Sequence, residues 1–107
     1  MGKKMKSRLV MLREWRRIVL EAAKAIKKVY PNAEIYVVGG AAENRLTIRS
    51  DIDLLVVLKE IEEEKASILA RIWEALEEKI PVYYPLELHV ISSSELHAIK
   101  GRKIRVM

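Results

Sequence analysis

Apolar residues recur every three or four positions along two long stretches of the chain. In residues 3–29 the repeat is carried by one stripe of side chains: Leu12, Trp15, Ile18, Val19, Ala22, Ile26 and Val29. In residues 62–80 a second stripe consists of Ile68, Leu69, Ile72, Trp73, Leu76 and Ile80. This period is typical of an amphipathic helix with one face against a core. We therefore predict two long helices, with most charged side chains on their outer faces.

Three shorter stretches are rich in β-forming residues. Residues 34–38 run into a glycine pair, residues 51–58 are apolar on both alternating faces after a polar start, and residues 86–91 alternate between apolar and polar side chains. The second pattern is typical of a central strand that is covered on both sides. The other two patterns are typical of strands bounded by turns. We therefore predict three strands.

Two short helical segments complete the predicted order of elements. Residues 41–45 have room for one helical turn, and Ser92 followed by Glu95 is a capping-box pattern that predicts a last short helix. The order αβ(α)βαβα predicts an α/β (α+β) fold in which a small mixed β-sheet is backed by helices. The 107 residues, half of them hydrophobic, suffice for one core, so we expect a single domain over residues 1–107.

The composition excludes several classes of site. The chain has no cysteine and only two histidines, which excludes disulfides, thiolate zinc sites and cysteine nucleophiles. Any metal is therefore expected to be a hard cation held by carboxylates. No apolar run approaches the roughly 20 residues that span a bilayer. We expect a cytoplasmic protein with no membrane partner.

The net charge of +5 is unevenly distributed. Residues 1–30 carry ten Lys or Arg against two Glu, residues 31–99 carry six against thirteen acids, and residues 100–107 carry four basic side chains. A polyanionic partner, or a partner with an acidic surface, would explain the basic ends. The alternative is a solvated helix face in a charge-rich protein.

Two aspartates begin the predicted central strand. Asp51 and Asp53 are two residues apart, so their carboxylates project from the same face. Their repulsion falls if a divalent cation lies between them, and Mg²⁺ favours one or two carboxylates together with the phosphates of a substrate. Glu87 would lie about 5 Å away if its strand neighbours the first. Three carboxylates can hold two metals, as phosphoryl and nucleotidyl transfer require.

The glycine pair supplies a second part of such a site. Gly39 and Gly40 lack side chains, so the backbone there can approach a triphosphate closely and offer N–H groups to it. A Gly-Gly pair alone usually marks a turn, and an Asp-x-Asp pair alone is usually a solvated strand end. Their conjunction predicts a metal-dependent nucleotide site.

Gly-Gly, ten further residues, and then Asp-Ile-Asp before an apolar strand resembles the signature of the DNA polymerase beta nucleotidyltransferase superfamily. Residues 38–57 are most similar to the minimal nucleotidyltransferases of bacteria and archaea. The resemblance implies the nucleotidyltransferase fold, Mg²⁺ or Mn²⁺ as cofactor and ATP as substrate. It implies three catalytic, metal-binding carboxylates: Asp51, Asp53 and Glu87. It also implies a set of nucleotide-binding residues: Gly39, Gly40, Ser50 and Arg49.

The chain departs from the family pattern at three places. Gly40 stands where the family usually has serine, and Ala41 and Glu43 stand where many relatives have arginine. Arg45 and Arg49 are the arginines that could compensate from the following loop. Glu87 replaces the commoner aspartate, and the alternative for Glu87 is a surface glutamate on a strand.

Small domains of this type resemble the antitoxins of two-gene modules whose partner is a helical HEPN protein. The resemblance implies transfer of AMP from ATP to a tyrosine of the HEPN toxin. We expect the acceptor to lie on another protein or at an interface between copies of this chain. Two alternatives stay open: an antitoxin that acts by occlusion alone, and a nucleic-acid-directed nucleotidyltransferase, which the basic segments suggest.

Three further residues lie near the predicted site. His89 shares a strand face with Glu87, and we expect a surface histidine beside an acid, with a contact to substrate as the alternative. Tyr83 and Tyr84 precede the third strand, where stacking on a nucleobase is open to them.

Overall fold

The computed structural model describes residues 8–47 and 49–107. The helices in these residues are α1 (Arg8–Leu12), α2 (Trp15–Val29), α3 (Gly39–Ala42), α4 (Lys65–Leu76) and α5 (Ser93–Leu96). The strands are β1 (Glu34–Val38), β2 (Ile52–Leu58), β3 (Leu86–Ser92) and β4 (Ile104–Arg105). The predicted fold class is confirmed, because a mixed sheet is backed by helices. None of the described helices is long and apolar enough to cross a membrane.

The sheet has the strand order β3-β2-β1-β4. β2 pairs with β1 in the antiparallel sense and with β3 in the parallel sense. β4 is antiparallel to the outer edge of β1, where Val37 pairs with Ile104 and Tyr36 with Arg105. The sequence pattern does not predict β4, because a two-residue strand within a basic segment has no periodicity of its own. The neighbouring edge of β1 determines its conformation.

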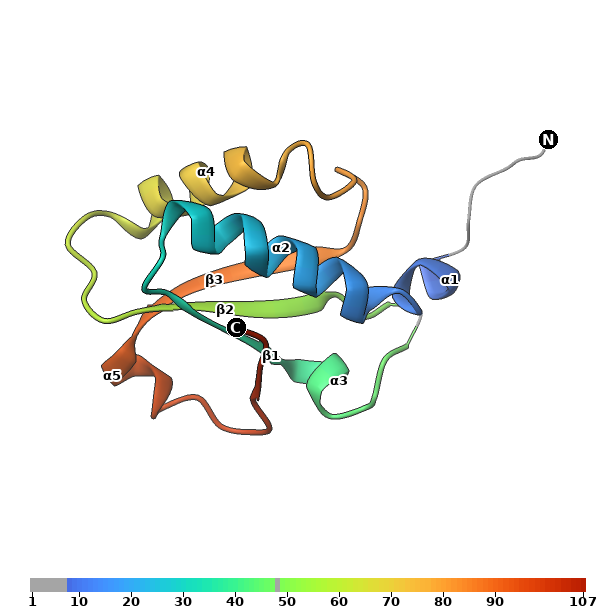
Figure 1. Cartoon of the computed structure of the whole chain (residues 1–107). Helices are drawn as coiled ribbons and strands as arrows, with labels where there is room; N and C mark the ends of the chain where they lie inside the picture. The colour runs from blue at the N-terminus through green and yellow to red at the C-terminus, as the bar shows by residue number, and fades with distance from the viewer. Residues whose placement is uncertain (1–7, 48) are drawn as a thin grey trace.

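The main core lies between one face of the sheet and the two longer helices. Figure 1 shows α2 and α4 side by side over this face. Residues 35 and 37 of β1 and residues 52, 54 and 56 of β2 are buried here, as the alternation of a strand requires. α4 ends at Leu76, earlier than the predicted 80, and residues 77–80 continue as turns.

The predicted first helix is interrupted in the structure. Residues 8–29 form α1 and α2 with a break at Arg13 and Glu14, and residues 3–7 lie outside the described part. At the break the carbonyl oxygen of Met11 accepts hydrogen bonds from the Tyr84 hydroxyl at 2.9 Å and from the Glu14 N–H at 3.2 Å. These two donors occupy the carbonyl that the N–H of Trp15 would use in a continuous helix.

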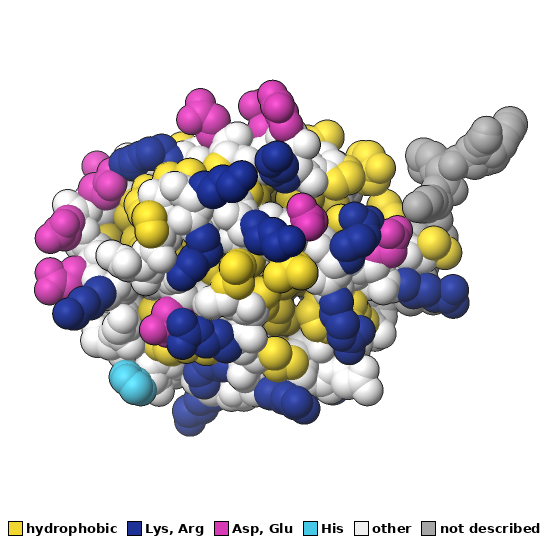
Figure 2. Space-filling view, in the orientation of Figure 1, with side chains coloured by type: hydrophobic (Ala, Val, Ile, Leu, Met, Phe, Trp, Pro, Cys, Tyr) yellow, Lys and Arg dark blue, Asp and Glu magenta, His cyan; other side chains and the backbone are white. Residues whose placement is uncertain are grey.

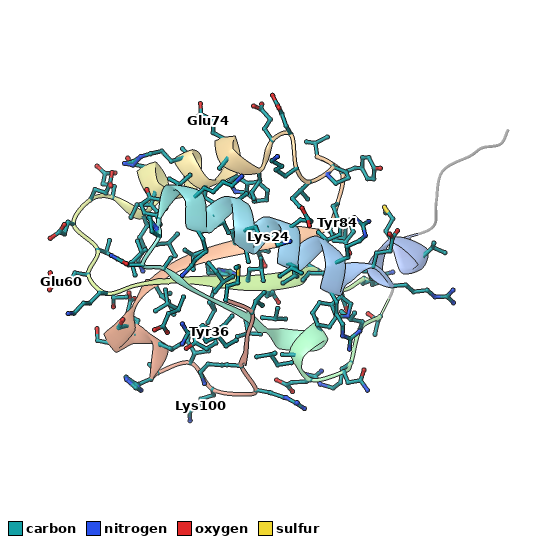
Figure 3. All side chains as sticks on the ribbon, viewed as in Figure 1. Lys24, Tyr36, Glu60, Glu74, Tyr84 and Lys100 are labelled. Carbon is teal, nitrogen blue, oxygen red and sulfur yellow. The ribbon has the colours of Figure 1, made fainter. Side chains whose placement is uncertain are left out.

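The opposite face of the sheet carries a smaller apolar cluster. Leu55, Val57 and Ile91 are buried there, with Tyr36, Val38, Leu96 and Ile99 packed against them. Figure 3 shows Tyr36 and Tyr84 on opposite sides of the sheet, and Tyr84 belongs to the main core. Tyr84 is therefore not placed to stack on a nucleobase beside the carboxylates, because its ring packs under the helices. Tyr83 is 70% exposed.

The short helix α5 contacts β2 and β3 and begins at the predicted capping box. The Ser92 hydroxyl accepts the backbone N–H of Glu95 at 3.2 Å, and the Glu95 carboxylate accepts the backbone N–H of Ser92 at 2.8 Å. Lys65 at the start of α4 also pairs with Glu95 at 3.1 Å. The capping box is thus confirmed, and the ion pair joins α5 to the helix layer.

Candidate metal and nucleotide site

Two of the predicted carboxylates meet across neighbouring strands. The parallel register of β2 and β3 places Asp53 directly opposite Glu87 and Leu55 opposite His89. Residues 53 and 55 alternate with the buried residues 52 and 54, so the acidic pair lies on the sheet face away from α2 and α4. The sequence predicts that Glu87 lies near the aspartates only if its strand neighbours theirs, and β2 and β3 are neighbours.

His89 lies against both carboxylates. Its Nε2 atom is 3.5 Å from Glu87 Oε1 and 3.8 Å from Asp53 Oδ1. One ligand atom from each of the three residues lies within 4.8 Å of the others. The His89 side chain is 45% exposed, as expected of a surface histidine beside an acid. It also offers a ligand atom to the same cluster as Asp53 and Glu87. The signal in the sequence is the spacing of Glu87 and His89, which puts both on one strand face.

The electrostatics of the cluster favour a bound positive charge. Burial, together with hydrogen bonding and charge repulsion from Glu87, raises the pKa of Asp53 from an ordinary 3.8 to about 6. The charge of Asp51 acts in the same direction, whereas His89 lowers the pKa. Neighbouring carboxylates stabilise a shared proton for the same reason that they stabilise a metal cation.

Asp51 lies one residue before β2, with an exposed side chain. The backbone N–H of Ile52 donates to the carbonyl of Pro85 at 2.8 Å, which joins this end of β2 to the segment before β3. The charge of Asp51 reaches Asp53, so the two aspartates share one electrostatic environment. The joint role of Asp51, Asp53 and Glu87 in metal binding stays a prediction.

Gly39 makes room for the Asp53 side chain. Its φ of +71° is in the left-handed region, and a Cβ atom built there would lie 2.6 Å from Asp53 Oδ2. A side chain at residue 39 would therefore be strained and would displace the carboxylate. At Gly40 the corresponding Cβ would meet the Arg45 carbonyl oxygen at 3.4 Å, an ordinary contact. The glycine pair thus has one position that excludes a side chain and one that does not.

The loop after α3 brings the remaining predicted residues to the glycine pair. The backbone N–H of Arg45 donates to the Gly40 carbonyl at 2.7 Å, and the Ser50 hydroxyl accepts the Thr47 N–H at 2.8 Å. Arg49 is exposed on the same loop. The side chain of Arg45 pairs with Glu43 at 2.9 Å. A Cβ atom built at Gly40 would lie 3.7 Å from the Ser50 hydroxyl oxygen, so these two residues are neighbours. Nucleotide binding by Gly39, Gly40, Ser50 and Arg49 stays a prediction.

A pocket of about 350 Å³ adjoins the cluster. Asp53, Glu87 and His89 line its polar side, and four apolar residues form the rest of the wall: Val38, Leu55, Ile91 and Ile99. Ile99 comes from the segment after α5, and no pattern in the sequence indicates that it reaches the site. The arrangement places Asp53, Glu87 and His89 at one side of a largely apolar pocket whose volume is large enough for an aromatic ring.

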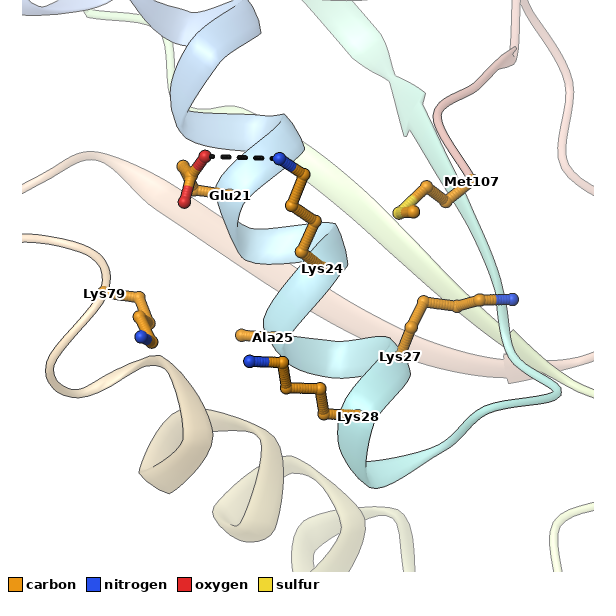
Figure 4. Close-up of a pocket in the computed structure, with 7 residues that line it drawn as sticks. All are labelled: Glu21, Lys24, Ala25, Lys27, Lys28, Lys79 and Met107. Atoms are coloured by element: carbon orange, nitrogen blue, oxygen red, sulfur yellow. Dashed lines mark ion pairs between the residues drawn. The ribbon is translucent and has the colours of Figure 1, made fainter.

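A second pocket lies on the opposite side of the molecule and has a different character. It has about 370 Å³ and is lined by four lysines, Lys24, Lys27, Lys28 and Lys79, together with Glu21, Ala25 and Met107. Figure 4 shows Lys28 on α2 and Lys79 on the segment after α4, and both side chains line the pocket. Within residues 8–47 and 49–107 neither has an ion-pair partner. Figure 2 shows basic side chains across this face.

Comparisons with known proteins agree with this geometry. A family described as "Nucleotidyltransferase domain" matches residues 18–106. The structure is similar to that of a proposed nucleotidyltransferase from Sulfolobus solfataricus, with a TM-score of 0.69 and 24% identity over 98% of this chain and 89% of that chain. It is also similar to another proposed nucleotidyltransferase, with a TM-score of 0.62 and 25% identity over 81% of this chain and 95% of that chain. No curated protein matches the sequence at a significant level.

Proposed function

Because this chain belongs to the nucleotidyltransferase domain family, we propose that it transfers a nucleotidyl group from a nucleoside triphosphate to an acceptor hydroxyl at the Asp53 and Glu87 cluster. The observation that carries the proposal is the register of β2 and β3, which sets these carboxylates opposite each other. Gly39 leaves the space that Asp53 occupies. The spatial arrangement supports this site, and the family match supports nucleotidyl transfer as the reaction.

The residues present fit a divalent metal ion. Two carboxylates and an imidazole offer ligand atoms within 4.8 Å of one another. Burial, followed by hydrogen bonding and charge repulsion from Glu87, raises the pKa of Asp53 to about 6, and a bound cation would stabilise the charged carboxylates. Asp51, Asp53 and Glu87 would hold Mg²⁺ or Mn²⁺. When bound, such an ion lowers the pKa of an attacking hydroxyl and neutralises the leaving pyrophosphate.

The side chains of this chain have distinct parts in the proposed transfer. The acceptor oxygen bonds to the α-phosphorus while the bond from that phosphorus to the bridging oxygen breaks, and pyrophosphate leaves with the electron pair. Glu87, 56% exposed against 28% for Asp53, is the carboxylate more open to an incoming acceptor and would take the hydroxyl proton. Asp53 lies against Gly39, so it would hold the cation that neutralises the triphosphate beside the glycine pair.

The donor and the acceptor can be specified further. We propose that the donor is ATP and that the acceptor is a tyrosine hydroxyl on a helical HEPN-type toxin that this chain neutralises. The apolar wall of the adjoining pocket supports a phenol, because an aromatic ring has apolar faces and a single polar tip. A sugar would bury several hydroxyls against side chains that cannot form hydrogen bonds.

The test is intact-mass analysis of this chain and the protein of the adjacent gene after incubation with ATP and either Mg²⁺ or Mn²⁺. We expect one AMP on the partner, lost in Asp53→Asn and retained in Glu78→Gln, which removes an acid outside the cluster. Peptide mapping of the product should place the AMP on a tyrosine.

Two outcomes would overturn the enzymatic proposal. AMP transfer that persists in Asp53→Asn would place the reaction elsewhere. Tight association without AMP transfer, unaffected by a metal chelator, would instead support an antitoxin that acts by occlusion.

A second candidate function rests on the four-lysine pocket. Lys28 and Lys79 extend into one cavity without acidic partners in the described residues, as a site for phosphate groups would require. A nucleic-acid-directed nucleotidyltransferase would bind RNA with affinity that falls steeply with salt, and Lys28→Gln with Lys79→Gln should reduce the salt slope by about two. A slope unchanged in the double variant would remove this candidate.

A further inference from the structure

We propose that His89 is a ligand of the metal ion at this site, and that the resulting nitrogen-containing set selects a transition-metal ion such as Mn²⁺ or Co²⁺ over Mg²⁺. The inference rests on the proposed function, and it adds the His89 imidazole to the carboxylates that would hold the ion. Three features support it: the position of His89 in the sheet, the distances in the cluster and the chemistry of imidazole.

The strand geometry directs His89 to the same point as the two carboxylates. Glu87 and His89 are two residues apart on β3, so both project from the face that carries Asp53. Three ligands from two adjacent strands are held by the hydrogen bonds of the sheet, which makes their spacing a property of the backbone. A set held this way changes little when an ion enters.

The distances suit ligands of one ion better than hydrogen bonds. His89 Nε2 is 3.5 Å from Glu87 Oε1 and 3.8 Å from Asp53 Oδ1, both beyond the usual range for an N–H···O bond. Ligands at about 2.1 Å from an ion lie about 3.0 Å from one another in cis octahedral positions and about 3.4 Å in tetrahedral positions. The imidazole nitrogen and the two carboxylate oxygens therefore need only small rotations to bind one cation.

The chemistry of the ligands determines which cation the set prefers. Mg²⁺ is held by oxygen ligands and keeps several waters, whereas imidazole favours the first-row transition metals. This difference disfavours Mg²⁺ relative to Mn²⁺ or Co²⁺.

An incidental contact would have a different consequence. If His89 only paired with the carboxylates as a cation, removing the imidazole would alter the metal-free protein and leave the ranking of metals unchanged. The other histidine provides the matched control, because His97 follows α5 with an exposed side chain and does not belong to the metal-ligand group found in the described residues.

The experiment is calorimetric titration of the full chain with MnCl₂ and with MgCl₂, for the wild type and for His89→Gln, His89→Asp and His97→Gln. We expect His89→Gln to weaken Mn²⁺ binding about tenfold or more, with a much smaller change for Mg²⁺. His89→Asp should move the preference toward Mg²⁺, and His97→Gln should behave like the wild type. The visible spectrum of bound Co²⁺ should change in His89→Gln, since nitrogen ligation is lost.

Equal Mn²⁺ affinity in the wild type and His89→Gln would overturn the inference. Asp53→Asn separates that result from a failure of the proposed function. Loss of both metals in Asp53→Asn, with no effect of His89→Gln, would leave the carboxylate site intact and exclude only the histidine. Retention of both metals in Asp53→Asn would overturn the site as a whole.

Discussion

At the scale of single residues, the position of the Asp53 carboxylate depends on the missing side chain at residue 39. The strand places Asp53 on the correct face, but its Oδ2 atom occupies the volume that a Cβ of residue 39 would fill. Two physical reasons therefore favour glycine at residue 39: the positive φ and the close approach of the Asp53 carboxylate. Gly39 and Asp53 are thus in direct contact, and the glycine affects the acidic cluster even without a bound triphosphate.

The first prediction concerns the two glycines as a matched pair. Gly39→Ala should destabilise the fold by roughly 1–2 kcal/mol through the left-handed backbone, with an added cost from the displaced carboxylate. It should also weaken metal binding. Gly40→Ala should change stability by less than about 1 kcal/mol, because its Cβ would make ordinary contacts only, the nearest at 3.4 Å from the Arg45 carbonyl oxygen. Chemical denaturation and metal titration of both variants test this, and equal behaviour of the two would contradict it.

The second prediction concerns pH. Folding raises the pKa of Asp53 from 3.8 to about 6, so between these values the folded, metal-free chain binds more protons than the unfolded chain. The free energy of unfolding should therefore fall as pH rises through this window. Asp53→Asn should remove this slope. Urea denaturation with a chelator at pH 4, 5, 6 and 7 measures it, and parallel curves for wild type and variant would exclude Asp53 as the origin of the slope.

At the scale of elements, α5 is a four-residue helix that depends on its cap. The capping box and the ion pair with Lys65 are the contacts that hold α5 below the sheet, and the segment after it carries Ile99 into the wall of the pocket. The backbone hydrogen bond from Ser92 and the proximity of Lys65 also lower the pKa of Glu95. Loss of the cap should therefore shift the segment after α5 and move Ile99 in the pocket wall.

The third prediction follows from this cap. Ser92→Ala should cost about 1 kcal/mol of stability, because the backbone N–H of Glu95 loses its acceptor. Hydrogen exchange should rise over residues 92–99 more than in the sheet. Ser93→Ala, at an exposed neighbouring position, is the control and should have little effect. A uniform change across the chain would argue against a local role for the cap.

The fourth prediction uses the two faces of β2. Leu54 lies in the main core, whereas Leu55 lies in the smaller cluster that borders the pocket. Leu54→Ala should cost about 2–5 kcal/mol, and Leu55→Ala should cost less because its surroundings can relax into the pocket. Only Leu55→Ala should alter use of the acceptor. Denaturation and transfer assays of both variants decide the matter, and a larger cost at Leu55 would be inconsistent with this division of the core.

At the scale of the whole molecule, the sheet separates the acidic cluster from the four-lysine pocket. The acidic cluster and its pocket lie on one side, and the four-lysine pocket lies on the side of α2 and α4. A partner that contacts the basic side would leave the acidic cluster accessible.

The fifth prediction links ligand binding to global stability. Mn²⁺ or Mg²⁺ with ATP should raise the melting temperature by roughly 10 °C at concentrations a hundred times the dissociation constant. Asp51→Asn with Asp53→Asn should abolish this rise and leave the metal-free protein no less stable, because repulsion among the acids is relieved. Thermal unfolding with and without a chelator measures both effects. A wild-type rise in the double variant would refute the site.

The sequence alone determined the local elements and their buried faces. Periodicity predicted the two long helical segments and three of the strands, and the spacing of Ser92 and Glu95 predicted the last helix. The sequence also placed Asp51 and Asp53 at the start of the central strand. These features depend on residues close together in the chain, whose spacing follows directly from helix and strand geometry.

Only the tertiary structure decided which distant residues meet. It set Glu87 opposite Asp53, brought His89 and Ile99 to the same site, buried Tyr84 under the helices and added β4 at the sheet edge. The periodicity of apolar residues predicts that one face of a helix or strand is buried, but it does not predict which element covers that face. Contacts of this kind depend on strand order and on packing between residues far apart in sequence, and the chemistry of the site depends on them.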